Sequence, residues 1–151
     1  MKIEDVLKTT NFKDEVHKAT LNVLYTSYWL KDHTSSALKE NGLTTEQFNV
    51  LRILRGKHPE SMCVRDIASR MIERSSNVPR IIDRLVVKKL VKRVQSKEDK
   101  RETLINITEA GLKQLEQASK SLESINRTIL GLTNQEAETL NMLLEKLRKI
   151  D

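Results

Sequence analysis

Few residues of this chain are of the kinds that build loops or crosslinks. The 151 residues include 4 glycines, 2 prolines and 1 cysteine, and aromatic residues make up 3%. A single cysteine excludes an intramolecular disulfide framework and fits a reducing compartment, so we expect a cytoplasmic protein. The scarcity of glycine and proline leaves little sequence for loops and indicates a mainly helical fold.

Long apolar runs and repeats are also missing. No stretch approaches the roughly 18 apolar residues that a membrane span needs, so we expect no membrane partner. The N-terminal segment MKIEDVLKTTNFKDE is acidic and unlike a signal peptide. Without an internal repeat, low-complexity tract or Gly/Ser linker, residues 1–151 are predicted to form a single domain.

Motifs of enzymes and metal sites are absent as well. The sequence holds no phosphate-binding glycine loop, no nucleophile elbow and no carboxylate pair in a recognisable frame. Its three histidines, His17, His33 and His58, lack the spacing of metal ligands. We therefore expect neither an enzyme nor a protein that needs a metal or another cofactor.

What the chain does have is a concentrated positive charge. Residues 52–101 carry 15 Lys and Arg against 6 Asp and Glu, a net charge of +9, whereas the rest of the chain has 12 against 15, or −3. A solvated charged face is the ordinary explanation of such a segment. A basic segment this localised also fits a polyanionic partner such as a nucleic acid.

Helical signals account for the first half of the chain. Residues 12–41 are predicted to form one long helix that stops at Asn41-Gly42. Thr44 with Gln47 is a capping box that opens the next helix, and Gly56 and Pro59 end it. A short helix over 64–71 follows, and then a helix over SSNVPRIIDRLVVKKL that Ser75 or Ser76 is expected to cap.

In the second half of the chain, the spacing of apolar residues changes from helical to alternating and then becomes helical again. Residues 90–96 and 102–107 are β-branched, partly alternating runs, which predicts a hairpin with the charged tip 97–101. Thr108 is expected to cap a helix that ends at Gly131, and Thr133 with Glu136 forms a second capping box for the last helix. The order predicts a mainly α protein with a small β-wing, a winged helix-turn-helix.

The basic segment has the features of a DNA-reading unit. An α-helix fits the major groove and reads base edges with polar side chains near its N-terminus. The helix from Ser75 has such residues there and presents Asn77, Arg80, Arg84 and Lys88 on one face. At the hairpin tip, Lys97, Lys100 and Arg101 suit phosphates or the electronegative minor groove.

Residues 43–111 resemble the MarR family of bacterial winged-helix transcriptional regulators. The most specific parts are IIDRLVVKKLVKR and the wing sequence Asp99-Lys100-Arg101 that runs into LINITEAG. The resemblance implies a sequence-specific regulator of transcription, a repressor released by a small ligand. It would bind double-stranded DNA as a homodimer, with a DNA-binding lobe at about 43–107 and dimerisation helices at 12–41 and 109–151.

The resemblance also assigns roles to residues of the lobe. It implies base or phosphate contacts for Ser75, Ser76, Asn77 and Arg80, and a minor-groove contact for Arg101. Asp99 matches a wing aspartate that supports a neighbouring arginine, because a carboxylate facing phosphate would be repelled. Arg84 is either the partner of Asp99 or a phosphate contact itself. Pro79 stands where the family commonly has Ser or Thr.

An apolar stripe supports a dimer independently of the resemblance. The last helix carries Leu140, Leu143, Leu144, Leu147 and Ile150 at helical spacing. Such a stripe serves either as intrachain core or as an interface between two copies. A two-fold dimer would place two recognition helices side by side on a pseudo-palindromic operator.

Two further groups leave alternatives open. Tyr25, Tyr28, Trp29 and His33 lie close together on the first long helix. They could line the family's pocket for an aromatic or amphipathic effector, or they could be interface core. Cys63 stands at the cap position of the short helix, with Asp66 three residues on, which allows a thiol-based redox sensor or a small half-buried residue. A winged-helix module that binds protein is the alternative to DNA binding.

Overall fold

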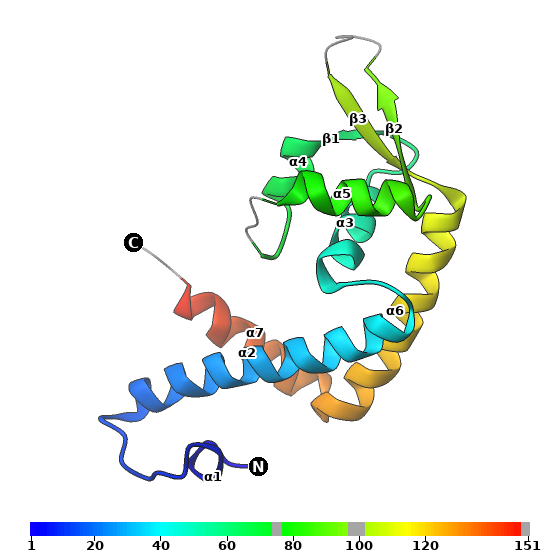
Figure 1. Ribbon diagram of the computed structural model, residues 1–151. Helices are drawn as coiled ribbons and strands as arrows, with labels where there is room; N and C mark the ends of the chain where they lie inside the picture. The colour runs from blue at the N-terminus through cyan, green and yellow to red at the C-terminus, as the bar shows by residue number, and fades with distance from the viewer. Residues whose placement is uncertain (74–76, 97–101, 149–151) are drawn as a thin grey trace.

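The computed structural model describes residues 1–73, 77–96 and 102–148, with the side chains of all of these except 125–130. In these residues helices dominate and one small sheet lies in the middle of the chain (Figure 1). The helices are α1 (Ile3–Leu7), α2 (Glu15–Glu40), α3 (Thr45–Arg55), α4 (Val64–Ser69), α5 (Val78–Val87), α6 (Glu109–Leu130) and α7 (Asn134–Leu147). The strands are β1 (Met62–Cys63), β2 (Val91–Gln95) and β3 (Thr103–Ile107).

The capping residues predicted from the sequence are present at three helix starts, which confirms these predicted boundaries. The Thr44–Gln47 and Thr133–Glu136 capping boxes are both formed, at the starts of α3 and α7. The Thr108 hydroxyl accepts a hydrogen bond from the Gly111 N–H at 3.0 Å and opens α6. Each of these caps satisfies backbone N–H groups that have no partner inside the helix.

The start of α5 differs from the sequence prediction. The helix begins at Val78, and its N-cap is Asn77, so the prediction that Ser75 or Ser76 caps this helix was wrong. Ser75 and Ser76 themselves lie outside the described residues. The physical reason is Pro79, which occupies the first turn of α5, where the N–H that proline lacks has no helical acceptor.

The predicted hairpin is present, and a third strand extends it. β2 pairs with β3 in antiparallel register from Val91 opposite Ile107 to Gln95 opposite Thr103. β1 pairs with the other edge of β3, Met62 opposite Ile105, which gives the strand order β1-β3-β2. β1 was missed because a two-residue strand has no measurable period and depends on a partner about 40 residues away in sequence.

The hydrophobic core lies inside the lobe formed by α3–α5, the sheet and the start of α6. Its fully buried side chains include Leu51, Leu54, Ile67, Ile82, Leu85, Ile105 and Leu115. From α2, the buried residues are Ala37 and Leu38, at its C-terminal end. The lobe therefore packs against the C-terminal end of α2, and the rest of that helix lies outside the core.

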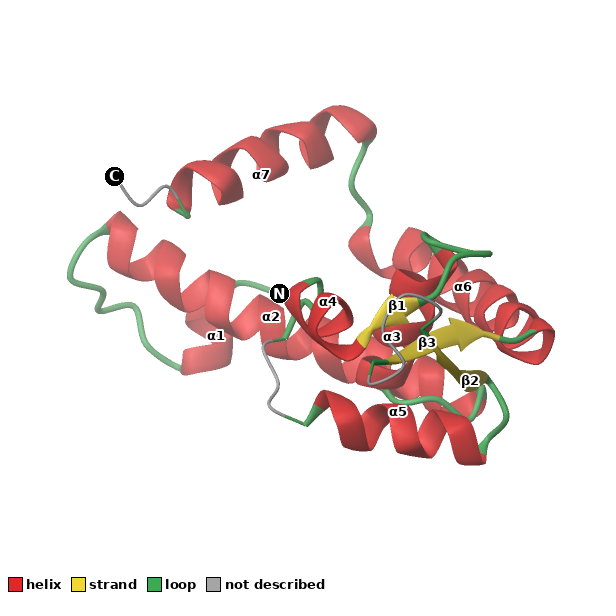
Figure 2. Ribbon diagram, turned by 90° about the horizontal axis from the view of Figure 1, so that it is seen from above, coloured by secondary structure: helices red, strands yellow, loops and turns green. Residues whose placement is uncertain are grey.

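The long helices form a separate arm. Figure 1 shows the sheet and α3–α5 at one end of the molecule, with α6 leading away from them to α7. In Figure 2, α7 stands apart from both α2 and the lobe, and it buries none of its described residues. The described residues of the stripe, Leu140, Leu143, Leu144 and Leu147, are therefore not intrachain core, and Ile150 lies outside the described residues.

The short helix α1 was not predicted from the sequence. It lies against α2, where Ile3 is buried and Glu4 pairs with Lys18 at 2.6 Å. The hydrogen bond from Lys18 lowers the pKa of the Glu4 carboxyl. A five-residue helix is unstable alone, so these contacts with α2 account for it better than any local signal does.

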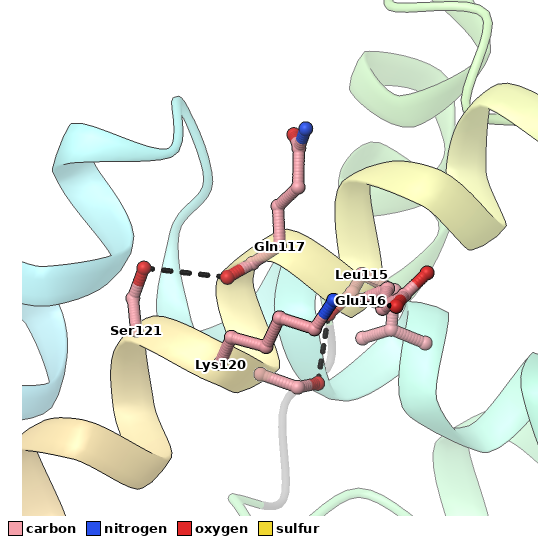
Figure 3. A network of polar contacts seen from close by, with 6 residues as sticks. Leu115, Glu116, Gln117, Lys120 and Ser121 are labelled. Atoms are coloured by element: carbon pink, nitrogen blue, oxygen red, sulfur yellow. Dashed lines mark hydrogen bonds and ion pairs between the residues drawn. The ribbon is translucent and has the colours of Figure 1, made fainter.

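The middle of α6 is amphipathic. Leu115 is fully buried in the core, whereas Glu116 and Lys120 form an exposed ion pair of 2.7 Å on the outer surface, shown in Figure 3. Beside them the Ser121 hydroxyl donates to the Gln117 carbonyl oxygen at 3.3 Å. The hydrogen bond from Lys120 lowers the pKa of Glu116, so this pair is ionised at neutral pH.

A strained residue joins α5 to β2 and allows a stability test. Lys89 has φ of 60°, a left-handed conformation that costs a residue with a Cβ about 1–2 kcal/mol. We expect Lys89→Gly to raise the free energy of unfolding by about 0.5–1 kcal/mol, since glycine's larger unfolded-state entropy offsets part of that relief. Urea denaturation measures the change. Lys89→Ala removes the same charge but keeps the Cβ, and if it stabilises as much as glycine does, strain is not the cause.

Candidate nucleic-acid interface

Helix α5 presents a polar face to solvent because its apolar face is bound to the lobe. Val78, Ile82 and Leu85 are buried against α3 and α4. Arg80 and Arg84 lie one turn apart on the exposed side. The short helix α4 precedes α5 and packs against it, so the two form a helix-turn-helix.

Of the predicted contact residues at the start of α5, the structure describes Asn77 and Arg80. Asn77 is exposed at the N-cap of α5. Arg80 lies in the first turn of the helix and is exposed to solvent as well. Free N–H groups and the positive end of the helix dipole also lie at this end, which favours a phosphate. This end of α5 therefore combines hydrogen-bond donors with positive charge.

Lys88 differs from the other residues that were expected on this face. It is the C-cap of α5, and its Nζ donates to the Gly42 carbonyl oxygen at 2.5 Å and to Gln47 Oε1 at 3.0 Å. Its ammonium is thus directed to the turn between α2 and α3. The Lys88 side chain supports the lobe in this structure, and a DNA contact by Lys88 stays a prediction.

The wing tip falls outside the described residues, and with it Lys97, Asp99, Lys100 and Arg101. The strands that carry the tip are fixed to α5 by an ion pair between Asp83 and Arg93, which sequence reasoning missed. Arg93 has no distinguishing feature in the sequence, since it is one basic residue of an alternating strand. No local signal connects it with a helix residue ten positions earlier. This pair holds β2 against the helix that bears Arg80 and Arg84.

Cys63 is the N-cap of α4, as its position in the sequence suggested. Its Sγ accepts a hydrogen bond from the Asp66 N–H at 3.4 Å, and the residue is half-buried. The thiol therefore has a structural role in starting α4. A redox role for Cys63 stays a prediction.

The aromatic group on α2 does not converge on one cavity. Tyr25 and Trp29 face a hollow between α1 and α2, whereas Tyr28 is exposed. The rings of Trp29 and His33 are in contact at a tilt of 46°, with centroids 4.4 Å apart, and His33 Nδ1 lies 2.8 Å from the Trp29 carbonyl oxygen. An effector pocket built from these four residues stays a prediction.

A cavity of about 140 Å³ lies elsewhere, where α2 meets the lobe. Thr34 of α2 forms one wall, the first turns of α3 form another, and Met71–Glu73 close it. Its surface is largely apolar, with Phe48, Met71 and Ile72 contributing. Sequence reasoning missed it because its walls come from three separate segments.

In the described parts of the chain, no helix has both the length and the apolar character to cross a membrane. Within residues 1–73, 77–96 and 102–148, no group of three His, Cys, Asp or Glu side chains is arranged to hold a metal ion.

Comparisons with known proteins agree with this architecture. A model of the MarR family matches residues 43–103. The chain is 35% identical to the HTH-type transcriptional regulator YpoP of Bacillus subtilis (strain 168), over 71% of this chain and 75% of YpoP. It is 30% identical to the HTH-type transcriptional repressor IacR of Pseudomonas putida, over 78% of this chain and 74% of IacR.

Solved structures share the fold. A mutant of the MarR protein from E. coli, in complex with operator DNA, aligns with a TM-score of 0.77 over 93% of this chain and all of that one, at 22% sequence identity. The mainly helical winged-helix fold predicted from the sequence is thereby confirmed.

Proposed function

The chain belongs to the MarR family of transcriptional regulators, and from this premise we propose that it is a homodimeric repressor that binds a pseudo-palindromic operator and is released by a small ligand. It would act in the cytoplasm and catalyse no reaction. In this proposal residues 43–107 read the DNA, and residues 12–41 and 109–151 form the dimer.

The observation that carries the proposal is the exposed face of α5. Val78, Ile82 and Leu85 of this helix are buried in the core, whereas Arg80 and Arg84 are exposed in a helix-turn-helix next to a basic wing. A helix so mounted can enter the major groove, where arginine binds guanine edges in a bidentate manner. The mutant MarR of E. coli, which has the same fold, was solved in complex with operator DNA, which supports DNA binding by this fold.

Dimerisation is supported by apolar surface that the single chain leaves exposed. Leu140, Leu143 and Leu147 share one side of α7 and are all exposed. Val16, Val23, Leu24 and Tyr28 are exposed on α2. Apolar side chains exposed along helices are typical of protein–protein interfaces, and a second copy of the chain would cover them. Two recognition helices would then lie about 34–36 Å apart, one turn of DNA.

Response to a ligand is supported by the cavity between α2 and the lobe. One wall belongs to α2, a helix of the proposed dimer interface, and another belongs to the segment that leads into α5. A ligand that prefers one spacing of these elements shifts the population of dimers toward that spacing. The distance between the two recognition helices would change with it.

Salt dependence tests DNA binding against the alternative of a protein-binding module. Duplexes selected from a random pool provide the operator, and its affinity is measured over a range of salt concentrations. We expect a steep loss of affinity with salt, with a log–log slope of about −0.9 for each phosphate contact. A flat salt response, or no selected sequence, would contradict DNA recognition.

Two arginine variants test the assigned contacts. We expect Arg80→Ala and Arg101→Ala each to weaken operator binding by about 1–3 kcal/mol, because each removes a charged contact with DNA. Fluorescence anisotropy with a labelled operator measures the affinity. Lys120→Ala is the control, since Lys120 lies on the outer face of α6 in a pair with Glu116. If both arginine variants bind as the parent does, the interface is placed wrongly.

A further inference from the structure

The ammonium group of Lys88 lies where two helices end. Lys88 is the C-cap of α5, and its Nζ donates at 2.5 Å to the carbonyl oxygen of Gly42, the residue that follows Asn41, the C-cap of α2. The C-terminal end of a helix carries a partial negative charge, so a cation is favoured at both of these ends. Lys88 therefore joins the end of α5 directly to the end of α2.

The turn that Lys88 contacts is itself bound to α3 and α6. The second acceptor of the Lys88 ammonium, Gln47 Oε1 at 3.0 Å, also accepts the Thr44 N–H in the capping box of α3, and Gln47 is buried. From α6, the Gln114 side chain donates to the Asn41 carbonyl oxygen. The end of α2, the start of α3 and the first half of α6 thus form one junction, to which Lys88 attaches α5.

This attachment bears on the geometry of the proposed dimer. α5 packs against α3, α4 and β2, and Lys88 adds a direct bond to the end of α2. In the proposed dimer, α2 and α6 belong to the interface between the two copies, whereas α5 carries Arg80 and Arg84. A displacement of α5 relative to α2 occurs in both copies of a two-fold dimer, so it changes the distance between the two recognition helices twice.

We propose that Lys88 is a positioning residue for operator recognition, which holds α5 in one orientation relative to α2 and α6 and so sets the half-site spacing that the dimer accepts. Two of the three N–H donors of its ammonium are engaged within the protein. Lys88 therefore acts on DNA binding through the placement of α5 and not through a contact of its own. The inference rests on the proposed function, since half-site spacing has a meaning only for a dimer on a two-part operator.

The test measures how strictly the half-site spacing is recognised. Fluorescence anisotropy gives the affinity of the full chain for its selected operator and for a derivative with one base pair added between the half-sites. The added base pair moves the half-sites apart by about 3.4 Å and rotates one relative to the other by about 35°. The affinity for the operator divided by the affinity for the derivative is the spacing ratio, which we expect to be well above one for the wild-type protein.

We expect Lys88→Met to lower the spacing ratio by at least roughly tenfold, because the variant keeps the apolar stem and removes the charged hydrogen bonds that hold α5. A residue with a merely structural role would lower the stability and both affinities, and the ratio would stay unchanged. Loss of a phosphate contact would also leave the ratio unchanged, and it would reduce the log–log salt slope by about 1.8 over the two half-sites. We expect Lys88→Met to keep the salt slope of the wild type.

Lys89→Met is the matched control, because it removes a charge from the next residue, which is exposed and lies beyond the C-cap of α5. Its spacing ratio should equal that of the wild type. The inference is overturned if the wild type binds both spacings equally, if Lys88→Met leaves the ratio unchanged or reduces the salt slope by about 1.8, or if Lys89→Met lowers the ratio as much.

Gln47→Glu tests the same contact from the acceptor side and does not depend on the folding of Lys88→Met. Glutamate keeps the capping box with Thr44 and replaces the neutral acceptor of Lys88 by a carboxylate, which forms the stronger bond. We expect the spacing ratio to rise above that of the wild type. A ratio equal to the wild-type value or below it contradicts the inference.

The wild-type measurements separate this inference from the proposed function. If the wild-type chain binds no selected duplex, the proposed function is wrong and this inference fails with it. If the wild type binds its operator and rejects the altered spacing, while Lys88→Met and Gln47→Glu keep the wild-type ratio, this inference fails alone.

Discussion

Replacing Gly111 by alanine is expected to lower the free energy of unfolding by about 3 kcal/mol, the upper range for an overpacked core position. A Cβ at this position would lie 2.1 Å from the Leu90 carbonyl oxygen and 2.8 Å from Ile107 Cγ1. Neither distance is sterically allowed, and the nearer atom belongs to the backbone. The main chain at the start of α6 or at the start of β2 would have to move.

The contact matters because Leu90 is part of the joint between the wing and α6. Its carbonyl oxygen accepts hydrogen bonds from the Thr108 backbone N–H at 3.1 Å and from the Thr108 hydroxyl at 3.0 Å. The same hydroxyl caps α6 through the Gly111 N–H. A shift of the Leu90 carbonyl therefore disturbs the helix cap and the base of the wing together.

Gly56→Ala is the matched control for this prediction. Gly56 ends α3 in a right-handed conformation, and a Cβ there would meet the Ile53 carbonyl oxygen at 3.4 Å, an ordinary contact. We expect this variant to be neutral or to gain about 0.4–1 kcal/mol, because alanine has fewer unfolded conformations than glycine. Chemical denaturation of both variants gives the comparison, and equal stabilities would show that the joint at Gly111 tolerates a side chain.

A charge in the apolar stripe of α7 is expected to abolish the dimer. Leu140 is exposed in the single chain, so Leu140→Glu removes no contact of the protomer's own core. In a two-fold dimer the substitution occurs twice, and each buried carboxylate without a partner costs several kcal/mol. The variant should be monomeric at micromolar concentration in size-exclusion chromatography with light scattering.

Loss of the dimer has a large consequence for DNA binding. Two linked recognition helices gain about 10²–10⁴ in affinity over one, because the second contact becomes intramolecular. We therefore expect the operator affinity of Leu140→Glu to fall by at least about 100-fold. Its thermal stability as a monomer indicates whether the fold itself is retained.

Met142→Glu provides a control with the same change of charge in the same helix. Met142 is 60% exposed against 44% for Leu140, and it points to a different side of α7 from Leu140 and Leu147. We expect this variant to stay dimeric and to bind the operator within a few-fold of the parent. If it dissociates as readily as Leu140→Glu, the interface is not the leucine stripe.

Local signals predicted the elements of this fold well, because they act over a few residues. Thr44, Thr108 and Thr133 mark helix starts through side-chain oxygens that reach N–H groups within one turn. The change from helical to alternating period located β2 and β3. The start of α5 was misjudged because Ser75, Ser76 and Asn77 are all good caps, and the weight of Pro79, which favours a start at Val78, was not recognised.

The candidate interface could be predicted in part. Arg80 and Arg84 were found from their spacing, which a helix converts into one face. The direction of Lys88 could not be found in this way, because its partners Gly42 and Gln47 are more than 40 residues away. The ion pair between Asp83 and Arg93 was missed for the same reason, as it joins a helix to a strand.

By itself the sequence determined the helical class, the order of α2 to α7 with the β2–β3 hairpin and the basic face of α5, which follow from short-range periodicity, capping and the kind of residue, while its resemblance to known regulators indicated the family. The tertiary structure alone decided that α7 has no cover among the described residues, that Gly111 lies against the Leu90 carbonyl, and that the buried Asn49 Oδ1 has no donor within residues 1–73, 77–96 and 102–148. These three features depend on distances between segments remote in sequence, and such distances are fixed only when the whole chain packs.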